Sequence, residues 1–173
     1  MKKKILLIHK KNCSYSFKLI RFLKKRLIKI KTSTSSENQE VLKILKKDNF
    51  DYIVLFRSHL ILKKNIINLF KKSCINFHPS TPNYRGIGGI NFAIYNNEIY
   101  FGSTSHFINE KIDDGKIINV FRFKINKKKE LDELYDETLY FMFKQAKYVL
   151  TNLDKLPLLC DQSKKEKWSK ILY

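Results

Sequence analysis

Three polar side chains have the types and spacing that proton transfer and oxyanion stabilisation require: Asn76, His78 and Asp113. Asn76 and His78 are two residues apart, so in an extended strand they project to the same side. An asparagine amide can donate to an oxygen that becomes negative in a transition state, which contributes about 10²–10³ in rate. Imidazole, with an unperturbed pKa of ~6.5, can take or hold a proton at neutral pH. A neighbouring carboxylate would favour its charged form and orient the ring. The set therefore fits acyl transfer to an amine, with a general base removing the amine proton.

Glycine and proline gather in the same part of the chain. All five glycines and two of the three prolines lie between residues 76 and 115. Glycine reaches backbone conformations that other residues resist, and proline fixes φ. We therefore expect residues 76–115 to form shaped loops around one site, to which Asp113 returns.

Strand-sized apolar runs and helical spacing alternate over the first half of the sequence. The expected strands are residues 4–9, 28–32, 52–56 and 74–77. The expected helices are residues 17–27, 41–45 and 61–70. This alternation predicts an α/β fold, a three-layer sandwich with a mostly parallel central sheet and helices on both faces. Ligands of such sheets bind beyond the carboxyl ends of the strands, where Asn76 and His78 are expected.

The second half predicts a different arrangement. A helix is expected over residues 90–95, and antiparallel strands over residues 101–108 and 117–125 are joined by the loop that carries Asp113. A long amphipathic helix is expected over residues 131–153. We expect a single domain over residues 1–153, followed by a basic tail over residues 154–173 that contains Trp168.

The chain is strongly basic, with a net charge of +19 from 35 basic and 16 acidic side chains. Such a charge attracts polyanions. Lysine is frequent throughout, so we interpret the charge as a general bias and expect an anionic small molecule in preference to nucleic acid as partner. A nucleic-acid-binding module driven by the basic first third remains an alternative.

Cysteine usage and hydropathy indicate the compartment. Three widely spaced cysteines offer no CxxC pair, so reduced thiols are expected. No apolar run approaches the roughly 20 residues of a membrane helix, and the apolar stretch near Met1 is too short for a signal peptide. We expect a cytoplasmic protein with no membrane partner.

Two motifs, found in order, resemble those of the folate-dependent formyltransferases. The first is Asn-x-His-Pro-Ser at residues 76–80, with Tyr-Arg-Gly at residues 84–86; the second is Gly-x-x-x-His-Phe-x-x-x-x-Ile-Asp-x-Gly at residues 102–115. The family includes glycinamide ribonucleotide formyltransferase, the amino-terminal domain of methionyl-tRNA formyltransferase, and sugar N-formyltransferases. The resemblance covers roughly residues 51–125. It implies a Rossmann-like formyltransferase fold and transfer of a formyl group from N10-formyltetrahydrofolate to a primary amine.

The resemblance also implies roles for single residues. It makes Asn76, His78 and Asp113 catalytic, with Asp113 preferred to Asp114. The residues implied for cofactor binding are Ser58, His59, Leu60, Ile61, Leu62, Ile108, Ile112 and Gly115. The residues expected at the acceptor are Tyr84, Arg85 and Gly86. His78, His106 and Asp113 have the ligand types of a metal site, but formyl transfer needs no Lewis acid and we expect no metal.

Departures from the family pattern bear on the acceptor. The segment before Asp51 is short, so the sheet is expected to lack one or two strands. Residues 9–14 lack the glycine-rich phosphate loop of the purine enzyme, and the sequence ends without the additional carboxyl-terminal domain of the tRNA enzyme. The turn after His78 is one residue shorter than is common, so the acceptor-side loop should differ. By elimination we expect an amino sugar attached to a nucleotide. Formyltetrahydrofolate hydrolysis and a non-catalytic relative that binds folate or an anion are the alternatives.

Overall fold

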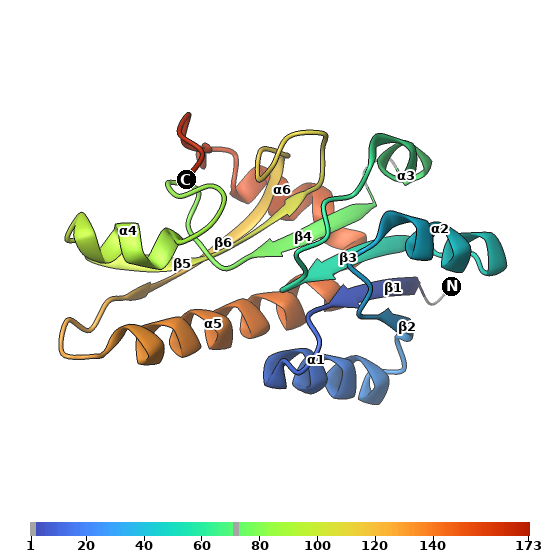
Figure 1. Cartoon of the computed structure of the whole chain (residues 1–173), viewed down its shortest axis with the longest axis horizontal. Helices are drawn as coiled ribbons and strands as arrows, with labels where there is room; N and C mark the ends of the chain where they lie inside the picture. The colour runs from blue at the N-terminus through green and yellow to red at the C-terminus, as the bar shows by residue number, and fades with distance from the viewer. Residues whose placement is uncertain (1–2, 71–72) are drawn as a thin grey trace.

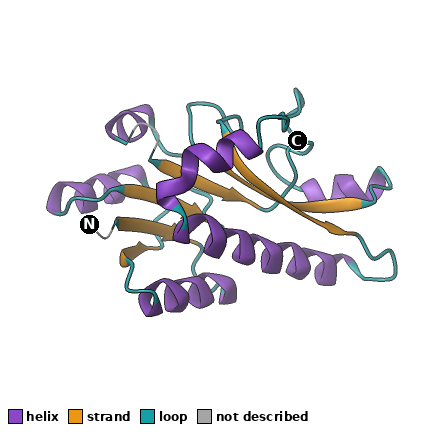
Figure 2. Cartoon of the chain, turned by 180° about the vertical axis from the view of Figure 1, so that it is seen from behind, coloured by secondary structure: helices purple, strands orange, loops and turns teal. Residues whose placement is uncertain are grey.

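A six-stranded sheet lies between two layers of helices (Figures 1 and 2). The computed structural model describes residues 3–70 and 73–173. The strands are β1 (Lys4–His9), β2 (Lys29–Ser33), β3 (Tyr52–Phe56), β4 (Cys74–His78), β5 (Tyr100–Phe107) and β6 (Ile117–Lys124). The helices are α1 (Ser14–Lys25), α2 (Asn38–Lys47), α3 (Lys64–Leu69), α4 (Gly89–Tyr95), α5 (Leu131–Thr151) and α6 (Leu156–Gln162), with a 3₁₀ turn η1 (Leu153–Lys155). The expected α/β three-layer fold is confirmed.

The first four strands form the parallel part of the sheet. The strand order is β2-β1-β3-β4-β5-β6, and the pairs β2–β1, β1–β3 and β3–β4 are parallel. Side chains of β1 alternate between the two faces: Ile5 and Leu7 join a core with α1, α5 and α6, whereas Leu6 and Ile8 join a core with α2 and α3. Both faces are therefore covered, which is why the central strands are continuously apolar.

The last two strands are antiparallel. β5 pairs antiparallel with both β4 and β6, with a register shift at Ser105 and His106. Gly102 of β5 comes so close to β6 that an added Cβ would lie 1.8 Å from the Phe121 carbonyl oxygen. This hairpin carries His106 on one strand and brings the loop with Asp113 back to the end of β4.

The expected helix over residues 61–70 is wrong at its start, because α3 begins at Lys64. The side chain of Asn38 holds residues 61–63 as a loop: its Nδ2 donates to the Ile61 carbonyl at 2.9 Å, and its Oδ1 accepts from the Lys63 amide at 2.9 Å. Leu60 and Leu62 meanwhile bury their side chains in the core beside α3. Tertiary contacts thus override the helical spacing.

The segment over residues 154–173, which composition describes only as a basic tail, contains most of η1 and all of α6. Leu156, Leu159 and Cys160 join the core beneath α5. Residues 166–173 then run without helix or strand beside residues 82–87 (Figure 1, red segment near the C label). We call residues 166–173 the strap.

Two further features of the fold are the state of the cysteines and the length of the helices. All three cysteines are buried free thiols. In the part of the chain that the structure describes, no helix is both long and apolar enough to cross a membrane.

Candidate active site

A cavity of about 380 Å³ opens beyond the carboxyl ends of β3 and β4. Its walls come from the loop after β3, the glycine turn before α4, the β5–β6 loop and the end of the strap. This is the position at which ligands of open α/β sheets bind. The cavity contains Asn76, His78 and Asp113, so the structure brings together the three residues that the sequence nominated.

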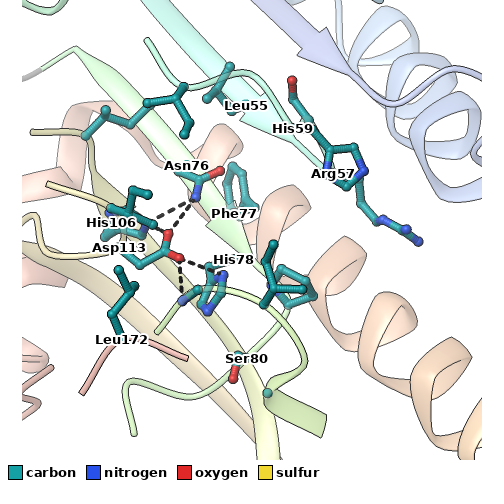
Figure 3. Close-up of a pocket in the computed structure, with 18 of the residues that line it drawn as sticks. Leu55, Arg57, His59, Asn76, Phe77, His78, Ser80, His106, Asp113 and Leu172 are labelled. Atoms are coloured by element: carbon teal, nitrogen blue, oxygen red, sulfur yellow. Dashed lines mark hydrogen bonds and ion pairs between the residues drawn. The ribbon is translucent and has the colours of Figure 1, made fainter. Parts of the chain in front are cut away.

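The carboxylate of Asp113 is the centre of the polar cluster (Figure 3). Its Oδ1 lies 3.3 Å from Asn76 Nδ2 and 3.3 Å from His106 Nε2. Its Oδ2 accepts from the Gly86 amide at 3.0 Å and lies 3.4 Å from His78 Nδ1. Asp113 is only 9% exposed, so these contacts operate away from bulk water.

Backbone conformation places the two partners of this cluster that come from loops. Asp113 has a φ of 41°, a region that non-glycine residues seldom occupy, although Asp tolerates it better than most. Gly86 has a φ of 86° and aims its amide at Asp113. Strained backbone of this kind costs about 1–3 kcal/mol for a non-glycine residue and persists where the surroundings fix it, commonly at functional sites.

The environment sets the charges of the cluster. Burial raises the pKa of Asp113, but the hydrogen bond to His106, the charges of His78 and His106 and the Gly86 amide outweigh burial and bring this pKa to about 2. Burial lowers the pKa of His78 below its usual range, and the facing Asp113 carboxylate opposes that shift. At neutral pH, Asp113 is therefore ionised beside a neutral His78.

Hydrogen bonds fix the tautomer of His78. Its Nε2 lies 2.9 Å from the Tyr84 carbonyl oxygen, which can only accept, so Nε2 carries the proton. The neutral ring then turns an unprotonated Nδ1 toward Asp113. A proton that reaches Nδ1 would complete an ion pair with this carboxylate.

His106 is bonded in a similar way. Its Nδ1 donates to the Phe107 carbonyl at 2.8 Å. Its Nε2 can accept from Asn76 Nδ2 at 3.2 Å when the ring is neutral, or donate to Asp113 when the ring is charged. His106 thus links the amide and the carboxylate of the cluster.

The residues predicted for the cofactor form one side of the cavity. Those that line it are Ser58, His59, Leu60, Ile61, Leu62, Ile108 and Ile112. We call this side, residues 57–62 with Ile108 and Ile112, the cofactor-side wall. Gly115 does not line the cavity; its carbonyl accepts the Trp168 indole N–H at 2.7 Å.

The residues predicted for the acceptor have mixed positions. Gly86 lines the cavity, whereas Tyr84 is buried and donates its hydroxyl proton to Glu98 at 2.9 Å. The Arg85 guanidinium donates to the Ile112 carbonyl at 2.8 Å and lies 3.4 Å from Asp114. Arg85 is thereby tied to the β5–β6 loop and does not line the cavity.

Sequence reasoning gave two parts of the site too little weight. His106 was named only for its metal-ligand type, although its place in the Gly-x-x-x-His motif was a usable signal for a position beside Asp113. The strap was not expected at all: Leu172 and Tyr173 line the cavity, and the ring of Trp168 lies edge-on to His106 at 5.0 Å between centroids. No local pattern in residues 166–173 indicates these contacts.

Sequence comparison finds relatives with named activities. Methionyl-tRNA formyltransferase of Clostridium tetani is 35% identical over 104 residues, which are 60% of this chain and 34% of the relative. The enzyme of the same name from Finegoldia magna is 30% identical over 113 residues, 65% of this chain and 36% of the relative. The chain spans about a third of the length of these curated relatives.

Solved structures share the fold at low sequence identity. Phosphoribosylglycinamide formyltransferase from Bacillus halodurans aligns with a TM-score of 0.73 and 20% identity over 87% of this chain and 95% of its own. The formyltransferase PseJ from Anoxybacillus kamchatkensis, in complex with a UDP-linked formamido sugar and tetrahydrofolate, aligns with a TM-score of 0.71 and 20% identity over 91% of this chain and 78% of its own. A variant of HypX from Aquifex aeolicus aligns with a TM-score of 0.79 and 17% identity over 100% of this chain and 29% of its own.

The family assignment follows from the sequence match. The family model described as formyl transferase matches residues 4–147, which include Asn76, His78, His106 and Asp113. Because that match covers most of the sequence, this chain belongs to the formyl transferase family.

Proposed function

We propose that this chain transfers a formyl group from N10-formyltetrahydrofolate to a primary amine, with Asn76, His78 and Asp113 as the catalytic residues. The observation that carries the proposal is the buried Asp113 carboxylate, which contacts Asn76, His78, His106 and the Gly86 amide at one end of a cavity. The family membership supports the same reaction.

The cofactor-side wall fits a folate. Leu60, Leu62 and Leu55 supply apolar surface for a flat heteroaromatic ring, and the adjoining loop offers backbone groups for its polar edge. Ser58, His59, Leu60, Ile61, Leu62, Ile108 and Ile112 would hold it. Gly115 would contribute indirectly, because an added Cβ there would lie 1.7 Å from the Phe107 carbonyl oxygen and displace the loop. The bound folate supplies the activated formyl group.

The chain's own residues would then act on the transfer. Attack by the amine forms a new C–N bond at the formyl carbon, and the bond from that carbon to N10 breaks. The Asn76 amide, which contacts Asp113 and His106 in this structure, would turn an N–H donor toward the oxygen that becomes negative. The proton lost by the amine would enter the pair formed by His78 and Asp113, where the unprotonated Nδ1 and the carboxylate together stabilise it. A proton must also reach N10 as its bond to the formyl carbon breaks, so that the donor leaves as tetrahydrofolate with an N10–H.

The acceptor is proposed to be an amine on a phosphate-bearing carrier. The net charge of +19 favours an anionic substrate. A sugar nucleotide is the first candidate, since PseJ, which holds a UDP-linked formamido sugar, shares the fold over 91% of this chain. Methionyl-tRNA is the second candidate, because the relatives at 30–37% identity carry that enzyme name.

The test is incubation with 10-formyltetrahydrofolate and a panel of amines that includes a UDP-linked 4-amino sugar and methionyl-tRNA. We expect a formylated amine and one equivalent of tetrahydrofolate. Release of formate in place of formyl-amine would assign a hydrolase. Tetrahydrofolate binding without either product, at any amine concentration, would assign a non-catalytic relative.

A further inference from the structure

We propose that the strap, residues 166–173, is the acceptor-side wall of the site and determines which amine the site admits. This inference rests on the proposed function, because it assigns the side of the cavity opposite the cofactor-side wall to the acceptor amine. The strap is separated by eighty residues of sequence from the glycine turn that it covers, so its role depends on how firmly it is held there.

Trp168 anchors the first half of the strap. Its indole N–H donates to the Gly115 carbonyl at 2.7 Å, directly after the loop that carries Asp113. Its ring lies edge-on to His106 at 5.0 Å and tilted to His78 at 6.2 Å. The Ser169 amide donates to the Pro82 carbonyl at 2.9 Å. This half of the strap therefore touches both histidines of the polar cluster and the turn that follows His78.

Backbone pairing anchors the second half. The Tyr173 amide donates to the Arg85 carbonyl at 3.0 Å, and the Ile87 amide donates to the Tyr173 carbonyl at 3.2 Å. Leu172 forms a parallel bridge with Arg85. An added Cβ on Gly86 would lie 2.3 Å from the Tyr173 carbonyl oxygen, so the two segments are in contact along their backbones.

Arg85 joins the strap to the loop that carries Asp113. Its guanidinium donates to the Ser169 carbonyl at 3.2 Å and to the Ile112 carbonyl at 2.8 Å, and Asp114 lies 3.4 Å away. An arginine with these partners is an internal clamp and has little capacity left for a substrate. The anionic part of an acceptor must then be met elsewhere.

The strap has the chemistry of an acceptor wall. Leu172 and Tyr173 both line the cavity, and Leu172 lies on the same side of it as Asp113 (Figure 3). Lys167 and Lys170 of the same segment are exposed and do not line the cavity. Apolar surface on a strap that also carries positive charge suits an amine on a carrier that bears phosphate. By covering the polar cluster, the wall also keeps water from competing with the amine.

Leu172 gives the sharpest test, because Leu158 is a matched control. Both leucines are 53% exposed, and Leu158 lies on α6 and does not line the cavity. The full chain, L172A and L158A are assayed with 10-formyltetrahydrofolate and with the UDP-linked amino sugar and methionyl-tRNA. L172A is expected to change the ratio of kcat/KM between the two amines by about tenfold, as loss of a pocket contact does, with the folate KM within about twofold. L158A should match the parent. If the ratio of kcat/KM between the two amines is the same in L172A as in L158A, the proposal is overturned.

Trp168 adds a test that separates chemistry from folding. W168F keeps a ring against His106 but removes the N–H that bonds the Gly115 carbonyl. The acceptor KM is expected to rise, and the share of formate among the products is expected to increase. The folate KM should stay within about twofold of the parent value. An unchanged acceptor KM, or equal increases in both KM values, would contradict the strap as an acceptor wall.

Amide hydrogen exchange distinguishes failure of the strap from failure of the proposed function. In the parent protein, the Ile87 and Tyr173 amides should exchange slowly, and W168F should accelerate both. Slow exchange with no formyl transfer to any amine would refute the proposed function while leaving the strap seated on the site. Rapid exchange at both amides in a protein that transfers formyl would overturn the strap as a wall.

Discussion

The two walls of the cavity are built in different ways. The cofactor-side wall follows β3 directly, and its Leu60 and Leu62 are each 5% exposed within the core beside α2 and α3. The acceptor side combines the glycine turn with the strap, and its Ile87 and Leu172 are 83% and 53% exposed. The cofactor-side wall is joined to the hydrophobic core through Leu60 and Leu62. The strap is held by backbone hydrogen bonds to a distant segment, by single side-chain hydrogen bonds and by ring contacts of its last residue.

This difference separates two kinds of change. A substitution in the cofactor-side wall disturbs core packing, which is costly for the whole fold. A substitution in the strap alters exposed side chains on a hydrogen-bonded scaffold, where effects on stability are usually small. On the proposed function, the acceptor preference would change while the folate-binding side of the cavity and the core remain intact. The following experiments test that separation.

The largest expected effect concerns Asp113, which the two walls share. Asp113→Asn removes the charge that stabilises a protonated His78, and we expect formyl transfer to fall by about 10²–10⁴. The control is Asp114→Asn, which removes a half-buried partner of Arg85 and should cost only a few-fold. Steady-state turnover and circular dichroism check both variants. A folded Asp113→Asn protein with parental turnover would refute the catalytic assignment.

The next effect is on stability as the pH changes. The folded-state pKa of Asp113 is about 2, below its ordinary 3.8, so its contribution of about 2 kcal/mol is present above pH ~4 and lost as the pH falls toward 2. The free energy of unfolding of the parent and of Asp113→Asn, measured by denaturant titration, should converge by that amount over this range. A constant difference between pH 5 and 2 would contradict the assignment.

His78 acts in a higher pH range. Its folded-state pKa is lowered, so the unfolded chain binds more protons and the protein should lose stability as the pH falls below ~6.5. His78→Gln should flatten this part of the profile of unfolding free energy, and an unchanged profile would contradict the assignment.

Gly86 tests the acceptor side. Gly86→Ala combines a φ of 86° with a Cβ placed 2.3 Å from the Tyr173 carbonyl oxygen, so the strap must move. We expect the acceptor KM to rise about tenfold with little change in the folate KM, as for loss of pocket contacts worth about 1–3 kcal/mol. Gly88→Ala is the matched control, because its φ is 78° but the nearest atom to an added Cβ is 3.7 Å away. Similar kinetics in both variants would attribute the effect to backbone strain instead.

Asn38 tests the cofactor side with the smallest expected effect. Asn38→Ala removes two hydrogen bonds that hold residues 61–63, each worth about 1 kcal/mol. The folate KM should rise about three- to tenfold, and the acceptor KM should not change. Asn65→Ala, at an exposed asparagine of α3 outside the cavity, is the control. An equal rise in both KM values would show that the two walls are not independent.

Much of the fold could be predicted from the sequence because its signals are local. Apolar runs locate β1, β3 and β4 closely, and they place Asn76 and His78 at a strand end. The two motifs also identify the loop that returns Asp113. The error at the start of α3 arose because Asn38, more than twenty residues away, competes for the backbone of residues 61–63.

The strap could not be predicted for a related reason. Its contacts depend on where the chain lies after the long helix α5 and then α6. These contacts join Trp168 to Gly115, Ser169 to Pro82 and Tyr173 to Arg85. The pattern of residue types within these eight residues does not indicate which distant segment they contact. Likewise, Arg85 has the charge of a substrate ligand in the sequence, while its internal partners are visible only in three dimensions.

Gly102 has a consequence for how relatives of this chain should be sorted. The closeness of its backbone to Phe121 leaves no space for a side chain, so natural variation at position 102 should be confined to glycine in every chain with this hairpin. That constraint applies whether or not the chain catalyses anything. A search that relies on this glycine would collect active enzymes and inactive descendants alike. On the proposed function, position 102 would distinguish members of the family, and Asn76, His78 and Asp113 would distinguish the active ones.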